Sequence, residues 1–143
     1  MKTLEMLGIV LLRFRPIPRA WAAVLIAINA CALLFINTSY GQANLVALGA
    51  AILVMSILHA RLGFVRLLGI GHVFWIPMLL WFAANLPDRA TQPWLYAWVV
   101  TLMACNCVSL VIDTIDVVRY ARGEREPHYR WQESADNQTL SAT

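Results

Sequence analysis

Three ionisable side chains lie beside apolar stretches of the sequence, where a charge is costly. They are His59, His72 and Asp113, and each flanks a different apolar run. With a helical rise of ~1.5 Å per residue, all three are expected about 22 to 28 Å from the same boundary of an apolar layer. Ionisable groups inside a bilayer are usually paired, hydrated or functional. The spacing therefore predicts a shared polar site.

Two imidazoles and a carboxylate suggest two kinds of bound group. His59, His72 and Asp113 together could hold zinc or another divalent transition metal, with water at an open position. Alternatively, the two imidazoles alone could hold a haem b, with Arg61 and Arg66 near its propionates. Because no local motif accompanies either set, the sequence predicts no cofactor, and the metal and haem sites stay alternative hypotheses.

The fourth apolar run carries a polar face. At 100° per residue, four side chains fall within an arc of about 80°: Asn106, Ser109, Asp113 and Asp116. One interpretation is a hydrophilic or proton-accessible path in which Asp113 titrates or binds a cation. The other is structural. Asn106 and Ser109 would then bridge helices, while both aspartates are hydrated at the interface and pair with arginines.

Three further residues have predicted structural roles. Asn29 is expected to meet Asn106 near the centre of the membrane, in a clamp worth about 1 kcal/mol. Gly49 is expected to admit a neighbouring backbone on the face that it shares with His59. Pro77 removes an amide donor inside its helix, which predicts a fixed packing kink, with a hinge as the alternative.

The elements that position these residues follow from composition. Of 143 residues, 60% are hydrophobic and 13% are charged, whereas soluble domains carry roughly 25% charged residues. Four uncharged runs span residues 20–36, 44–58, 73–86 and 94–112, and the middle two reach membrane length only by including 59–60 and 69–72. Since no run alternates like a barrel strand, the sequence predicts an all-α integral membrane four-helix bundle.

The segments that flank the bundle have their own predictions. Residues 1–19 resemble an N-terminal interfacial amphipathic helix that ends at Pro16 and Pro18. A signal peptide is the alternative, disfavoured because bulky residues occupy the expected cleavage site. Residues 20–122 form the predicted bundle, and residues 123–143 are expected to be a flexible cytoplasmic tail.

The distribution of basic residues predicts the orientation. All of the 11 Lys and Arg residues except Arg89 fall on one expected side of the membrane. The positive-inside rule therefore places both termini in the cytoplasm of a bacterial-type inner membrane. The net charge of +3 is too small to suggest nucleic acid as a partner, which leaves the lipid bilayer and other membrane proteins.

These features favour a small transport or channel-type protomer with a polar site on the cytoplasmic side. Because one four-helix unit encloses little interior, self-association is expected. Enzyme activity is not predicted. Cys105 and Cys107 are about 200° apart on a helix, which excludes a shared thiol site. The alternatives are a non-catalytic accessory or assembly subunit of a membrane complex, and a bis-histidine haem or metal-binding membrane protein.

Overall fold

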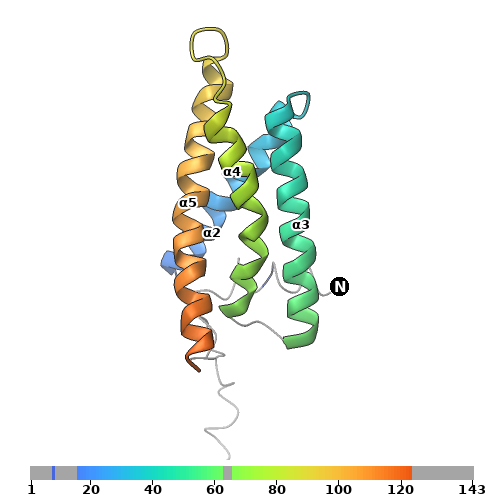
Figure 1. Ribbon diagram of the computed structural model, residues 1–143, viewed down its shortest axis with the longest axis vertical. Coiled ribbons are helices and arrows are strands. Elements are labelled where there is room, and N and C mark those ends of the chain that lie inside the picture. The colour runs from blue at the N-terminus through green and yellow to red at the C-terminus, as the bar shows by residue number, and fades with distance from the viewer. Residues whose placement is uncertain (1–7, 9–15, 63–65, 124–143) are drawn as a thin grey trace, which may run out of the picture.

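The computed structural model describes residues 8, 16–62 and 66–123, and within this part of the chain all regular structure is helical. Six helical elements follow one another along the chain, two of them 3-10 helices: α2 (Pro16–Ala30), η2 (Cys31–Phe35), α3 (Ser39–Leu62), η3 (Arg66–Phe74), α4 (Trp75–Ala84) and α5 (Pro93–Ala121). Figure 1 shows that they form an up-and-down bundle, with α2 behind α4 and α5. The predicted all-α four-helix bundle is confirmed.

Four segments are long and apolar enough to cross a membrane. They are Pro16–Phe35, Ser39–Leu62, Leu67–Ala84 and Pro93–Ala121. Each apolar run of the sequence lies mainly within one of them, so the chain is a multi-pass membrane protein with four spans. Apart from Gly8, residues 16–19 and Gly123, the predicted interfacial helix and the predicted tail lie outside the described residues.

The first span begins earlier than expected. Pro16 and Pro18 lie in the first turn of α2, and the helix that they were expected to end lies outside the described residues. The amide groups of a first turn have no intrahelical partner, so a proline there removes no helical hydrogen bond. The residues expected to separate an interfacial segment from the bundle therefore belong to the first span.

The third span changes its winding partway across. Residues 66–74 form the 3-10 helix η3, and α4 starts at Trp75. Pro77 consequently lies in the first turn of α4, where its missing amide removes no hydrogen bond of that α-helix. The predicted kink at Pro77 stays a prediction. A 3-10 helix rises ~2.0 Å per residue against ~1.5 Å in an α-helix, so 18 residues reach about 31 Å, close to the ~30 Å of a hydrocarbon core.

The apolar core lies where α4 and α5 meet the preceding helices. Its largest fully buried apolar side chains are Trp75, Phe82, Leu102 and Val99. The rings of Phe35 and Trp98 stack with centroids 4.8 Å apart, which joins η2 to α5. Trp98 also donates a hydrogen bond from Nε1 to the carbonyl of Ile28 at 2.9 Å. The contacts of Trp98 hold α2 and η2 against α5, in the half of the bundle farther from His72 and Asp113.

Gly49 does not have the role predicted for it. It is exposed on α3, and a Cβ added there would meet nothing within 4 Å. The third span instead approaches α3 at Gly71, where a Cβ would lie 3.0 Å from the carbonyl oxygen of Ala51. The close approach between α3 and the third span is thus made possible by Gly71, since Gly49 faces away from the third span.

Candidate functional site

An imidazole–carboxylate pair joins the third and fourth spans. Nδ1 of His72 in η3 lies 2.7 Å from Oδ2 of Asp113 in α5, and the two side chains are 16% and 21% exposed. A contact of this length has the geometry of a charge-assisted hydrogen bond. The pair lies in the half of the bundle where α3 and α5 end (Figure 1). Both residues were candidates from the sequence, and the structure brings them together.

The 3-10 winding of η3 orients the imidazole. With three residues per turn, side chains at positions i and i+3 eclipse one another, and Gly69, His72 and Trp75 have this spacing. The His72 ring stacks on the Trp75 ring with centroids 4.0 Å apart and an interplanar angle of 21°. In an α-helix the same residues would be about 60° apart around the axis. The winding therefore sets the imidazole on a buried indole and directs it toward α5.

Two glycines allow η3 to lie close to both neighbouring helices. A Cβ on Gly69 would be 2.6 Å from Oδ1 and 2.8 Å from Cβ of Asp113, which is closer than real Cβ atoms come. A Cβ on Gly71 would be 2.4 Å from Cγ of Met55 in α3. The two glycines face different helices, so their missing side chains fit η3 between α3 and α5.

The remaining polar face of α5 binds α2 rather than lining a path. Asn29 donates from Nδ2 to Oδ1 of Asn106 at 3.0 Å, and Trp21 donates from Nε1 to Oγ of Ser109 at 3.1 Å. Asn29, Asn106 and Ser109 are all buried. The predicted contact between Asn29 and Asn106 is confirmed. This favours the structural interpretation of Asn106 and Ser109 over a continuous hydrophilic path.

A third asparagine adds to this clamp and was missed by the sequence analysis. Asn44 is fully buried in α3 and donates from Nδ2 to the backbone carbonyl of Asn29 at 3.1 Å. Because Asn44 begins the second apolar run, the sequence analysis treats it only as a boundary. The sequence did carry a signal for this contact. Asn29, Asn44 and Asn106 lie in three different apolar runs, and asparagines inside a membrane fulfil their hydrogen bonds by pairing across helices.

His59 and Asp116 are not part of the printed contact between His72 and Asp113. His59 is 6% exposed on α3, and Asp116 is half-buried on α5. Within residues 16–62 and 66–123 no group of three or more His, Cys, Asp and Glu side chains could hold a metal ion. The predicted ligand set of His59, His72 and Asp113 is therefore not assembled there. His72 lies on the same side of η3 as Gly69, which faces α5. Gly71 instead faces α3, the helix that carries His59.

Comparison with protein-family models, with curated proteins and with solved structures finds no match for the chain. Its class therefore follows from the fold and the described side chains alone. It is a four-span α-helical membrane protein with an imidazole–carboxylate pair between its third and fourth spans.

Proposed function

We propose that the chain is a small transport or channel-type protomer in which the His72–Asp113 pair binds and releases a proton. The 2.7 Å contact between the two side chains carries this proposal, because it joins two membrane-spanning segments. Ionisable side chains within spans commonly mark ion pathways and proton relays. Both side chains are partly exposed at the surface of one copy, and the proposal requires that this surface faces water or a passage between copies.

Proton exchange at the pair would alter the contact between η3 and α5. When His72 is an imidazolium and Asp113 a carboxylate, the pair is neutral and the hydrogen bond is charge-assisted. Loss of the proton leaves one negative charge, and gain of another leaves one positive charge. Either change removes the attraction between opposite charges and weakens the hydrogen bond, so the contact between η3 and α5 would loosen. If η3 then relaxed toward α-helical winding, His72 would turn by about 60° relative to Trp75.

The proposal includes an orientation and an assembly. The pair would lie in the cytoplasmic half of a bacterial-type inner membrane, with both termini in the cytoplasm, because Arg61, Arg119 and Arg122 lie at that end of the bundle. Trp75, Phe82 and Leu102 fill the space between the described helices. A passage would therefore form between copies, as a homo-oligomer. An obligate foreign subunit in native mass measurements would instead favour the accessory role.

Flux through reconstituted vesicles tests the transport role. The full chain is placed in vesicles that contain a pH-sensitive dye, and flux is measured across a pH or cation gradient. Asp113→Asn and His72→Gln should each lower the pH-dependent flux about a hundredfold or more, the scale of a lost proton-transfer group. The matched control is Asp88→Asn, which changes an exposed carboxylate in the 85–92 loop. Unchanged flux in Asp113→Asn, or wild-type flux equal to that of empty vesicles, contradicts the proposal.

One observation favours a metal or haem site as a second candidate. Histidines that bind a metal commonly direct their other ring nitrogen to a carboxylate, and Nδ1 of His72 faces Asp113 in this way. Nε2 of His72 would then be the ligand atom, and residues beyond the His72–Asp113 pair would supply the further ligands. An absorption spectrum and an elemental analysis of the purified protein test this candidate. A Soret band or a stoichiometric metal supports it, and a colourless, metal-free protein contradicts it.

A further inference from the structure

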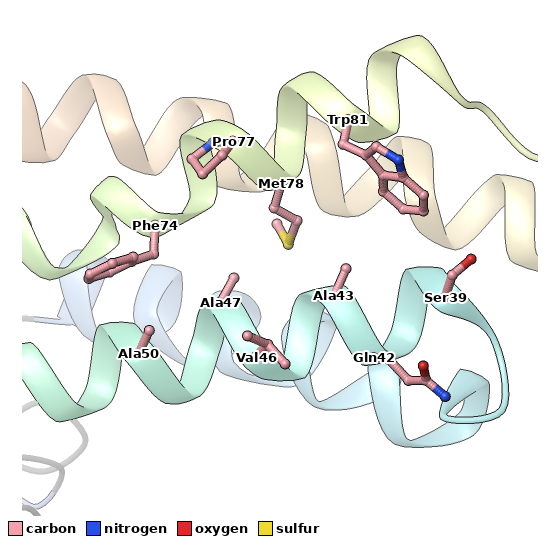
Figure 2. A pocket seen from close by; sticks show the side chains of 10 residues that line it. All are labelled: Ser39, Gln42, Ala43, Val46, Ala47, Ala50, Phe74, Pro77, Met78 and Trp81. Carbon is pink, nitrogen blue, oxygen red and sulfur yellow. The ribbon is translucent and has the colours of Figure 1, made fainter.

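An open apolar groove of about 540 Å³ runs between α3 and the third span. Figure 2 shows alanine side chains of α3 facing larger side chains of α4 across it. Ala47 and Met78 form its floor and are each 6% exposed, while Ala43, Ala50 and Phe74 lie along its sides. The groove is separate from the His72–Asp113 pair, and none of the residues that line it has a role in the proposed transport.

The groove results from how the two spans separate. Gly71 lets η3 pack against Ala51 of α3, and the spans diverge from there toward the 85–92 loop (Figure 1). Alanines at the facing positions of α3 are too small to fill the resulting space. At the far end the ring of Tyr40 lies against Trp81, with centroids 5.2 Å apart. The groove therefore ends near the close contact of Gly71 with Ala51 and is open along one side.

The length of the groove identifies its occupant. From Ser39 to Ala50 it extends about 16 Å along α3, which is close to half of a ~30 Å hydrocarbon core. Polar Ser39 and Gln42 line its outer end, together with Trp81, whose indole suits a membrane interface. The remaining lining is apolar. We propose that the groove binds one acyl chain of a phospholipid from the leaflet at that end, with the headgroup near Ser39 and Gln42.

A second copy of the chain fits this groove less well. A spanning helix needs about 20 residues and presents contacts along the full ~30 Å of the hydrocarbon core. The groove provides half of that length, since it is closed off where Gly71 packs on Ala51. An acyl chain from one leaflet ends near the membrane centre, which is where the groove also ends. The lipid site does not depend on the transport proposal.

Lipid retention and photo-cross-linking test the proposed site. The full chain is purified in mild detergent from vesicles of phosphatidylcholine that carries a diazirine on one acyl chain. Native mass spectrometry should show a phospholipid retained by the wild-type chain, and light should cross-link it to groove residues more than to Leu53 or Leu80. Both reference residues are exposed on the apolar surface, at 62% and 67%, and neither lines the groove.

Three matched substitutions distinguish lipid binding in the groove from general contact of lipid with the apolar surface. Ala43→Phe and Ala50→Phe each place a ring in the groove and should lower lipid retention about tenfold, which corresponds to about 1.4 kcal/mol of binding free energy. Ala97→Phe makes the same change at an exposed position of α5 and should retain lipid. Circular dichroism confirms that each variant folds, and the wild-type cross-links are informative even if one does not.

Three results would overturn the proposal. The first is a wild-type chain that retains no phospholipid. The second is cross-linking of groove residues no greater than that of Leu53 and Leu80. The third is an intermolecular disulfide formed by the variant Ala43→Cys, which would show that a second chain occupies the groove.

Discussion

Asp113 and His72 meet because the residues around them leave room for the contact. Gly69 is the closest of these, since its missing side chain admits the carboxylate. Trp75 supports the opposite side, where its indole covers one face of the imidazole. The proposed proton site therefore depends on a glycine and a tryptophan that bind no proton themselves.

Substitution of Gly69 should weaken the site and the fold together. Gly69→Ala places a Cβ 2.6 Å from Oδ1 of Asp113, and such overpacking typically costs about 1 to 3 kcal/mol. We expect lower thermal stability in detergent and a smaller pH-dependent flux. Gly49→Ala is the matched control, because a Cβ there meets nothing within 4 Å. That variant should be as stable as the wild type or more so, since alanine favours a helix over glycine by about 0.5 to 1 kcal/mol. Equal losses in both variants would contradict the assignment.

The asparagine clamp should show strong coupling between its two halves. Asn29→Leu leaves the amide of Asn106 buried without its partner, which costs about 1 to 3 kcal/mol. The double variant Asn29→Leu/Asn106→Leu removes both amides and should recover part of that loss. Unfolding free energies of the two single variants and the double variant form a double-mutant cycle. Additive losses would show that the 3.0 Å hydrogen bond contributes nothing.

At the scale of elements, the third span differs most from expectation. Gly69 and Gly71 let this span approach α5 and α3 closely. The 3-10 winding could not be predicted, because nine residues are compatible with periods of 3.0 and 3.6 alike. Pro77 was located correctly within the span, but its effect depends on where α4 begins. That start is fixed by the packing of η3 between α3 and α5.

The loop before α5 has a pH-dependent contact. The backbone N–H of Thr91 lowers the pKa of Asp88 below its ordinary value of 3.8, and the Thr91 hydroxyl lowers it further. A carboxyl group whose pKa falls on folding stabilises the fold above its unfolded pKa, and this contribution is lost as the pH drops through the folded pKa.

Asp88→Asn should therefore reduce the thermal stability at neutral pH and make no difference once the pH is below the pKa of Asp88 in the folded protein. Thermal unfolding at a series of pH values measures this effect. Thr91→Ala, which removes the hydroxyl donor but keeps the backbone donor, should cause a smaller change. A stability difference between Asp88→Asn and wild type that does not vary with pH would rule out this contribution.

At the scale of the whole molecule, composition was sufficient to predict the number of spans but not the rotation of each helix about its own axis. Four apolar runs predict four helices, because a backbone in hydrocarbon must satisfy its own hydrogen bonds. Spacing alone also placed His72 and Asp113 at similar depths. It could not show that His72 turns toward α5, or that Gly49 faces outward, because side-chain packing between helices sets each rotation. The groove was beyond prediction for the same reason, since it depends on how far two spans diverge.

The mixed winding of the third span links its height to the membrane around it. Conversion of the nine residues of η3 to α-helical winding would shorten the span by about 4 Å. Hydrophobic mismatch costs a fraction of a kcal/mol per ångström, so a thin membrane would favour the shorter form and a thick one the taller form. Only the taller form, in which η3 keeps its 3-10 winding, aligns residues 69, 72 and 75 on one side of the helix. Lipid composition could thus adjust how firmly the imidazole is held, without any ligand at the site.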